Sequence, residues 1–308
     1  MEKHLGMRVR DWGILLALSV LWGGSFFFAK VALPEVPPLT LVFLRVSLAA
    51  LALGFVLRAR GVKIPRAPGI WFAFLGMGLL NNLIPFTLLF WGQTEIAGGL
   101  ASILNATTPI FSLIAAHLLT ADEKLSPAKL AGILLGIAGV AVLIGGGLVM
   151  PHGPPLLPMF ACLGAALSYG LAGVYGRRFR RMGVPPMLGA FGQTVTSSCM
   201  SLPLALLVDA PWRLPMPGEG VILAILGLAF LSTALAYILF FHILAVGGAV
   251  NSSLVTLLIP VSAILLGSLF LGEHLAANEF AGMGLIGFGL LVIDGRIFHL
   301  WRRRAATA

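Results

Sequence analysis

The residues best suited to bind a solute are polar side chains placed before two prolines inside apolar runs. Residues 102–109 and 253–260 each hold polar side chains seven and four positions before a proline. In order, these residues are Ser102, Asn105 and Pro109, then Ser253, Thr256 and Pro260. This spacing puts all three on one helix face, and the proline frees the carbonyl four positions earlier. We predict that both faces line a polar cavity at helix kinks, although a tolerated kink explains the same pattern.

Aromatic side chains are the second feature that could bind a solute. Trp22 lies inside an apolar run and precedes Ser25 and Phe26, whereas the other five tryptophans lie at the ends of runs or between them. Aromatic faces suit flat apolar groups and, through the ring quadrupole, ammonium groups. The expected aromatic and hydroxyl lining is Trp22, Ser25, Phe26, Phe86, Tyr169 and Tyr237. The alternative for Trp22 is packing between helices.

One charged side chain, Arg45, lies deep in an apolar run. A charge is costly inside a membrane, so Arg45 is a candidate functional residue. Its counterpart in the second half of the chain is the neutral Gln193, and a structural bond to backbone carbonyls explains Arg45 equally well. All eleven acidic residues fall at the ends of apolar runs or between them, which argues against coupling through an intramembrane carboxylate.

Sequence motifs of enzymes and cofactor sites are missing. The chain has no HExxH, no GxSxG and no phosphate-binding P-loop. Cys162 and Cys199 lie in separate apolar runs without CxxC spacing, which argues against a disulfide or a metal site. We expect no catalytic residues, no metal and no cofactor.

Composition assigns the chain to a class. Of 308 residues, 59% are hydrophobic and only 10% are charged, against about a quarter charged in soluble domains. Apolar runs of about 20 residues, long enough to cross a bilayer core, recur along the chain. We predict an all-α polytopic membrane protein with ten transmembrane helices, at residues 12–31, 38–57, 70–92, 97–119, 127–145, 156–176, 186–208, 219–244, 248–271 and 277–294.

The basic residues predict the orientation. With a cytoplasmic N-terminus, 17 of the 20 Lys and Arg residues fall on the inner side and one, Arg213, falls outside. Such an excess marks the cytoplasmic side of membrane proteins. We therefore expect a multi-pass protein of a bacterial-type inner (plasma) membrane with both termini in the cytoplasm. The net charge of +9 sits in short clusters between apolar runs, which does not indicate nucleic-acid binding.

The two halves, residues 1–150 and 151–308, resemble each other at an offset near 150. The pair Pro37-Pro38 matches Pro185-Pro186, each opening the second helix of its half. With five helices in each half, the second copy must enter the membrane from the opposite side, and its basic tail is cytoplasmic. Inverted-topology five-helix repeats are typical of secondary carriers, whose substrate site lies where the repeats meet.

Opposite charges occupy matching places at the two mouths of the expected cavity. Lys30 and Glu273 fall on the outer side, and Arg177 and Glu123 fall on the inner side. We expect these to be gate pairs that close alternately as the repeats move. The alternative is that each glutamate favours the N-terminal end of a following helix, while Arg177 belongs to the inner basic cluster.

Several motifs, in this order, resemble the EamA family of the drug/metabolite transporter superfamily. They are Leu21-Trp22-Gly23-Gly24-Ser25-Phe26 running to Lys30, then Pro38 to Arg45, Pro109 to Glu123, and Pro260 to Glu273. The resemblance covers roughly residues 10–296 and is greatest to YddG-type bacterial exporters of aromatic and other neutral amino acids. It implies a ten-helix inverted-repeat fold in the inner membrane and amino-acid or metabolite export. Gln193, which matches Arg45, departs from a symmetric pattern.

We expect a transporter that exports small neutral or zwitterionic metabolites, amino acids including aromatic ones, by alternating access through a central cavity. Helices one, three and four of each half should line the cavity, and helices two and five should form a scaffold. The expected partners are a small-molecule substrate and the lipid bilayer, with no nucleic acid and no obligatory protein partner.

Three other functions fit the sequence less well than this one. A nucleotide-sugar or sugar-phosphate exchanger needs several buried cations, and only Arg45 is deep. A membrane-embedded enzyme lacks a catalytic set. An ion channel needs a ring of charges or a filter-like loop, and the sequence shows neither.

Overall fold

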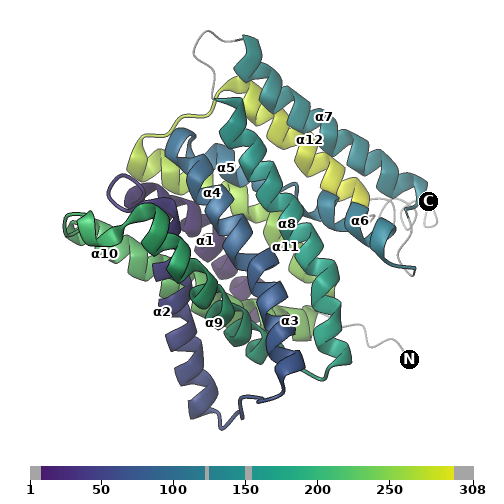
Figure 1. Cartoon of the computed structure of the whole chain (residues 1–308). Coiled ribbons are helices and arrows are strands. Elements are labelled where there is room, and N and C mark those ends of the chain that lie inside the picture. Colours follow the sequence, from purple (N-terminus) through teal and green to yellow (C-terminus); the bar gives the residue numbers. More distant parts are fainter. Residues whose placement is uncertain (1–7, 122–124, 150–154, 295–308) are drawn as a thin grey trace.

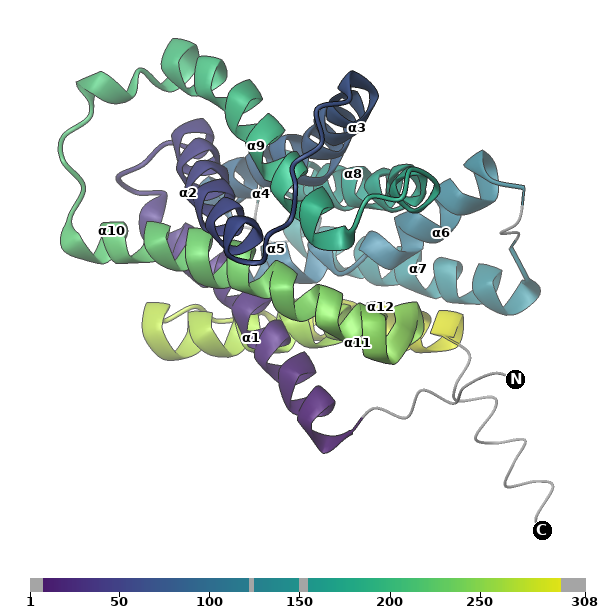
Figure 2. The same ribbon diagram turned by 90° about the horizontal axis from the view of Figure 1, so that it is seen from below.

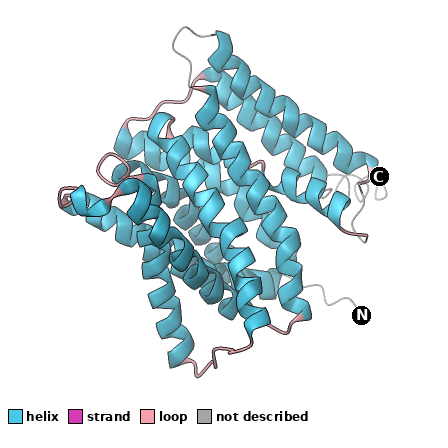
Figure 3. Cartoon of the chain, viewed as in Figure 1, coloured by secondary structure: helices cyan, strands magenta, loops and turns pink. Residues whose placement is uncertain are grey.

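The computed structural model is a bundle of membrane-length helices, with no strand in the part of the chain described (Figures 1 and 3). We describe residues 8–121, 125–149 and 155–294, leaving out the side chains of residues 146–149, 247–253 and 294. The first half contains α1 (Val9–Ala32), α2 (Pro38–Ala59), α3 (Pro68–Gly78), η1 (Leu79–Leu83), α4 (Ile84–Glu95), α5 (Gly98–Asn105), α6 (Thr108–Leu119) and α7 (Pro127–Val149). The second half contains α8 (Leu156–Arg181), α9 (Pro186–Leu204), η2 (Ala205–Asp209), η3 (Pro211–Arg213), α10 (Glu219–Leu226), η4 (Gly227–Leu235), α11 (Ala236–Leu271) and α12 (Ala277–Asp294).

Proline and glycine explain several helix limits. Pro38, Pro68 and Pro186 are the first residues of α2, α3 and α9, where the missing N–H costs no helical hydrogen bond. Gly61 and Gly183 follow α2 and α8 with φ of 66° and 65°, a left-handed conformation that glycine adopts without a Cβ clash. Consecutive spans run in opposite directions, but most of their packing contacts are with spans that are not next to them in the sequence.

The described residues contain nine helices long and apolar enough to cross a membrane, and the shorter apolar helix Ala277–Ile293 follows them. These ten segments agree with the ten predicted spans and confirm an all-α polytopic membrane protein. Two spans are less regular than predicted. The third combines α3, η1 and α4, and the fourth is interrupted between α5 and α6, next to Pro109.

The predicted boundary between residues 244 and 248 is helical, because α11 continues from Ala236 to Leu271. The helix is not straight, however. Leu18 packs in one buried cluster with both Ala236 and Val255. Nineteen residues of straight α-helix would hold those two about 28 Å apart. The chain must therefore fold back between them, which agrees with two separate apolar spans, Glu219–Val246 and Leu254–Leu271.

The third span of each half contains a π-helical segment at a matching place. These segments are η1, Leu79–Leu83, and η4, Gly227–Leu235. A π-turn frees or shifts backbone bonds that must be satisfied inside a membrane. The Ser168 hydroxyl donates to the Leu80 carbonyl oxygen at 2.7 Å, and the Thr233 hydroxyl donates to the Leu228 carbonyl oxygen at 2.8 Å. Each of these bonds satisfies one backbone carbonyl of a π-helical segment.

Among the contacts between the halves, two pairs join equivalent helices of the two repeats. The fifth helices, α7 and α12, lie side by side at one edge of the bundle (Figures 1 and 2). Glycines allow this close approach, since a Cβ on Gly132 would lie 2.6 Å from the Gly289 carbonyl oxygen. The second helices, α2 and α9, also pack on each other. The remaining spans surround a central cavity between these pairs.

Candidate functional site

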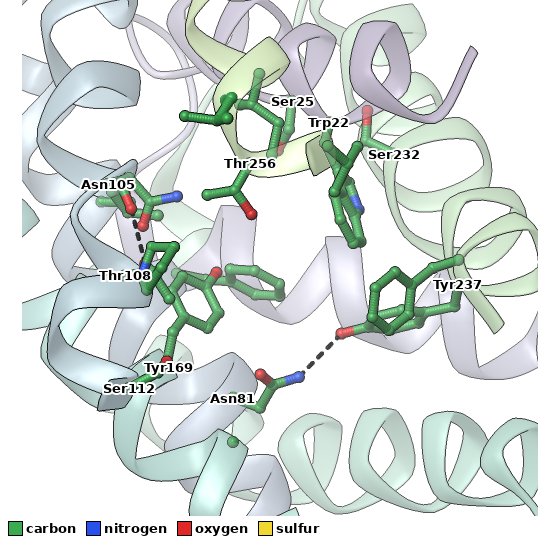
Figure 4. A pocket seen from close by; sticks show the side chains of 18 of the residues that line it. Trp22, Ser25, Asn81, Asn105, Thr108, Ser112, Tyr169, Ser232, Tyr237 and Thr256 are labelled. Carbon is green, nitrogen blue, oxygen red and sulfur yellow. Dashed lines mark hydrogen bonds between the residues drawn. The ribbon is translucent and has the colours of Figure 1, made fainter. Parts of the chain in front are cut away.

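A cavity of about 840 Å³ lies at the centre of the bundle, and both halves contribute to its lining. Its polar and aromatic lining includes Trp22, Ser25, Arg45, Asn81, Phe86, Asn105, Tyr169, Gln193, Ser232, Thr233, Tyr237 and Thr256. Figure 4 shows Trp22 and Tyr237 on the side of this space opposite Asn105, with Asn81 hydrogen-bonded to Tyr237. The first, third and fourth spans of each half line it, as predicted. So do the second helices, through Arg45 of α2 and Gln193 of α9, and the fifth helices, through Lys129 of α7 and Leu290 of α12. The second and fifth helices are therefore more than scaffold.

Most of the residues predicted from sequence meet at this cavity. Those that line it are Trp22, Ser25, Phe26, Phe86, Asn105, Tyr169, Tyr237 and Thr256. Ser102 does not, because its side chain is fully buried and its hydroxyl donates to the Gly99 carbonyl oxygen of the same helix at 2.6 Å. The predicted residue Ser253 lies outside the described side chains.

The two matched prolines act differently. Pro109 is the second residue of α6, and the helix is interrupted just before it. The carbonyl that Pro109 frees, on Asn105, accepts a hydrogen bond from the Thr108 hydroxyl at 2.7 Å (Figure 4). Pro260 lies inside α11, whose helical backbone continues past it. Of the two prolines, only Pro109 lines the cavity, and only Pro109 coincides with a helix break.

Arg45 is buried, with 4% of its surface exposed, and its guanidinium is held from three directions. Nε donates to the Thr233 hydroxyl and Nη1 to the Ser25 hydroxyl, both at 2.9 Å. The Phe86 ring covers one face, with its centroid 3.8 Å from Cζ. No acidic side chain within the described ranges forms an ion pair with Arg45. The predicted alternative, bonding to backbone carbonyls, is wrong, because both acceptors are side-chain hydroxyls.

Both halves contribute to a neutral hydrogen-bonded cluster beside the cavity. The Asn81 amide donates to Gln193 Oε1 at 3.1 Å and to the Tyr237 hydroxyl at 3.4 Å. The Tyr237 hydroxyl in turn donates to Asn82 Oδ1 at 3.0 Å, and the Asn82 amide donates to the Ser197 hydroxyl at 3.0 Å. This chain of bonds fixes η1 against α9 and α11 and holds the Tyr237 ring at the cavity wall.

Aromatic rings form two groups in the lining. Trp22 packs on Phe240 with centroids 5.3 Å apart, and both line the cavity. Phe86 lies 6.2 Å from Phe90 and 6.5 Å from Tyr169, between centroids. These separations are typical of favourable aromatic pairs. The site thus combines flat apolar walls with one buried cation and a polar cluster.

At the end of the cavity where α4 and α5 meet, the lining is covered. Phe26 and Gln93 line that end and are 6% and 1% exposed. The lining at the other end includes Lys129, at the start of α7, whose side chain is partly exposed. Since α7 starts on the side where α1 begins, the cavity extends toward the side of the chain's N-terminus.

Lys30 and Glu273 hold the α4–α5 loop at the covered end. The Lys30 ammonium donates to the carbonyl oxygens of Gln93 and Ile96, at 2.9 and 3.0 Å. The Glu273 carboxylate accepts the N–H groups of Gly98 and Gly99, at 2.9 and 3.2 Å. The cation thus caps the end of α4 and the anion caps the start of α5, as helix dipoles favour. No ion pair joins them in the described structure, so the predicted direct contact is replaced by two contacts to one loop.

The predicted inner pair is only partly visible. Arg177 lies near the end of α8 and is partly buried. Glu123 lies outside the described residues, so its pairing with Arg177 stays a prediction. No group of three or more His, Cys, Asp or Glu side chains that could hold a metal ion occurs in the described part of the chain.

Sequence reasoning missed Asn81, Gln193 and Thr233 as lining residues. A signal for them exists: Asn81-Asn82 and Ser232-Thr233 are adjacent polar pairs inside apolar runs, 151 positions apart. Gln193 matches Arg45 and was judged by its lack of charge. Polar residues at matching places of both repeats are therefore a better indicator of the site than charge alone.

The cavity thus lies between two similar five-span halves. The profile of the EamA-like transporter family matches residues 11–145 and again residues 156–294. The chain belongs to the EamA-like transporter family. Because the family has one match in each half, the matches coincide with the internal repeat read from the sequence.

Relatives support this assignment over nearly the full length. A Salmonella typhimurium protein named "Probable amino-acid metabolite efflux pump" is 30% identical and is matched over 97% of this chain and 99% of its own. The Bacillus subtilis "Uncharacterized transporter YoaV" is 26% identical over 90% of this chain and 94% of its own. A crystal structure of 22% identity covers 93% of this chain and 98% of its own with a TM-score of 0.64, which shows the shared fold. The protein is a multi-pass membrane transporter and not an enzyme.

Proposed function

We propose that this transporter exports small neutral or zwitterionic metabolites, amino acids including aromatic ones, from the cytoplasm by alternating access. The observation that carries the proposal is the central cavity, which joins aromatic walls, a polar cluster and one buried cation between two repeats. We further propose that it resides in a bacterial-type inner membrane with both termini cytoplasmic, since 17 of its 20 Lys and Arg residues then lie inside.

The size and chemistry of the cavity support this class of cargo. Its volume of about 840 Å³ falls within the range of about 300–1,000 Å³ found for small-molecule sites. The Trp22 and Phe86 rings suit the side chain of an aromatic amino acid. Gln193, Asn81 and Thr256 offer hydrogen bonds without charge. Relatives named as amino-acid metabolite efflux pumps support the same cargo.

A transport assay with purified full-length protein tests the proposal. Proteoliposomes loaded with labelled L-phenylalanine, L-tryptophan or L-threonine should release them faster than liposomes without protein, and an excess of unlabelled amino acid should slow that release. Running the assay with and without a pH gradient distinguishes proton coupling from facilitated diffusion. No protein-dependent release of any of a panel of the common L-amino acids would refute amino-acid export.

The alternative cargo, a nucleotide sugar or sugar phosphate, carries two or more negative charges. The described cavity lining offers Arg45 in its interior and Lys129 at its N-terminal-side end. Multiply charged phosphates need several cations close together. The same proteoliposomes loaded with uridine diphosphate glucose should therefore show no protein-dependent release.

A further inference from the structure

We infer that Arg45 is the carboxylate-binding group of the central cavity, so that the cargo binds with a single carboxylate against its guanidinium. The inference rests on the proposed function and narrows its substrate class. It assigns the unused edge of the guanidinium to the solute. It also assigns Ser25 and Thr233 as positioning residues that hold this edge toward the cavity.

The first argument is the uncompensated charge. Arg45 is 4% exposed, and its side-chain partners are two hydroxyls and the Phe86 ring, all formally neutral. A buried cation without a counter-ion is costly, and natural proteins nearly always pair it. Hydroxyl dipoles and a ring face reduce that cost but do not remove the charge. A bound carboxylate would neutralise it.

The second argument is the number of donors. A guanidinium has five N–H groups in a fixed planar fork and cannot lose its proton in a protein. In the described structure two of the five donate, one from Nε to Thr233 and one from Nη1 to Ser25. One N–H of Nη1 and both of Nη2 remain. The Nη1–Nη2 edge, which keeps donors on both nitrogens, can donate two parallel hydrogen bonds to a carboxylate.

The third argument is that the fork is held in place before a solute arrives. Thr233 belongs to η4 and its hydroxyl also donates to the Leu228 carbonyl, so its orientation is fixed by its own helix. Phe86, stacked on Phe90, covers one face of the guanidinium and limits its rotation. A donor set ordered in advance loses less entropy when it binds its ligand.

The charge count selects a monocarboxylate. One negative charge neutralises Arg45, whereas a phosphate dianion would leave net negative charge in a site with one deep cation. The lining also contains buried acceptors that lack partners in the described structure, Asn105 Oδ1 and Ser232 Oγ. Both can accept from an ammonium group. The same cavity can therefore satisfy both ends of a zwitterion.

The test compares matched ligands that differ in the carboxylate. Full-length protein in detergent is titrated with L-tryptophan, L-tryptophan amide and indole-3-propionate, and binding is measured by calorimetry. For the wild type we expect L-tryptophan to bind at least about tenfold more tightly than its amide, the cost of leaving a buried charge unpaired. Indole-3-propionate, which keeps the carboxylate, should bind more tightly than the amide.

Variants then locate the effect. R45Q should bind L-tryptophan and its amide equally, because the charge and the fork are gone, and R45K should retain part of the preference because the charge remains. R58Q, an exposed arginine on the same helix, should keep the wild-type ratio. The ratio of the two affinities separates a binding role from a structural one, since loss of fold lowers both together. The ratio of the two affinities in the wild type is a test by itself, because no substitution has altered the fold.

Every outcome decides the matter. If the wild type exports amino acids but binds acid and amide equally, or if R45Q keeps the preference, Arg45 is a structural cross-link and the inference is wrong while the proposed function stands. If amino acids are not exported but indole-3-propionate binds in an Arg45-dependent way, the proposed function fails and the carboxylate site stands. If neither carboxylate binds, the inference is wrong, and release of the amino-acid panel from proteoliposomes decides the proposed function separately.

Discussion

The two halves of the chain build the same crossing contact with different chemistry. In the first half, Arg45 of α2 reaches Thr233 in the π-helical segment of the second half, at 2.9 Å. In the second half, Gln193 of α9 accepts from Asn81 in the π-helical segment of the first half, at 3.1 Å. Each second helix is thus tied to the third span of the other half. One tie carries a charge with donors to spare, and the other is neutral and linked into a larger cluster.

This difference shows how two similar repeats can form a cavity whose two walls differ chemically. Repetition places α2 and α9 against each other and puts a π-helical segment opposite each of them. The residue types then divide the tasks. Gln193 completes a hydrogen-bonded network with Asn81 and Tyr237 that fixes one wall of the cavity. Arg45, in contrast, keeps N–H donors without an acceptor in the described structure. On the proposed assignment of Arg45, a solute with one charged end would meet two unlike walls and would bind in one orientation.

The largest expected effect comes from removing the charged member of the comparison. Arg45→Gln makes the halves alike at this position and should reduce transport by about 100-fold, since losing a buried charge–charge contact costs roughly 3 kcal/mol. The exchange Arg45→Gln with Gln193→Arg should not restore it, because Ser25 and Phe86 have no counterparts around Gln193 in the described contacts. Initial rates of amino-acid efflux from proteoliposomes measure both. Recovery in the double variant would mean that the halves are interchangeable.

The next effect concerns the loop between α4 and α5. Lys30 caps the end of α4 and Glu273 caps the start of α5, so the swap Lys30→Glu with Glu273→Lys puts each charge at the wrong helix end. We expect the double swap to be less stable than either single variant, by about 1–2 kcal/mol per site. Thermal unfolding in detergent and transport rates check this. A direct gate pair predicts the opposite, that the double swap restores function.

A smaller effect is expected from the aromatic wall. Trp22→Ala removes a partly exposed ring from the lining and its contact with Phe240, and should lower transport of aromatic amino acids about tenfold. Expression and thermal unfolding should stay near wild type, since one aromatic pair contributes about 1 kcal/mol. Asn105→Ala and Thr256→Ala should show the same separation. A parallel fall of transport and melting temperature would identify Trp22 as a packing residue.

The smallest effect is expected at the neutral member of the comparison. Gln193→Ala removes one acceptor, but Asn81 keeps its bond to Tyr237, and Tyr237 keeps its bond to Asn82. Loss of one neutral hydrogen bond costs about 1 kcal/mol, so transport should fall about fivefold or less. Affinity for L-tryptophan amide relative to L-tryptophan should not change. A loss as large as that of Arg45→Gln would contradict the assignment of unlike roles to the two halves.

Sequence alone predicted the ten apolar spans, the repeat and part of the polar and aromatic cavity lining. Lipid forces every span to satisfy its backbone bonds internally, so hydropathy and proline positions suffice to find the helices. Asn105 and Thr256 were found by their spacing before two matched prolines, and Trp22 because it is the one tryptophan inside an apolar run. Arg45 was found by its charge, which is costly inside a membrane.

Contacts between distant helices were decided by tertiary structure. The spacing of Ser102 and Asn105 puts them on one face of a helix, but only packing decides that Ser102 faces its own backbone and Asn105 the cavity. Lys30 and Glu273 were found as opposite charges near one mouth, yet what they bind is a loop that neither charge pattern nor hydropathy identifies.

One hydrogen-bond partner of Arg45, Thr233, lies 188 positions away in a π-helical segment. Local sequence determined which residues are too polar to face lipid, because the free-energy cost of placing a polar side chain in lipid depends on that side chain itself. Which of them meet depends on the angles at which whole helices pack and on the turns within them. Those are properties of the assembled bundle, and they gave the Arg45 guanidinium two neutral hydrogen-bond partners in the wall of the cavity.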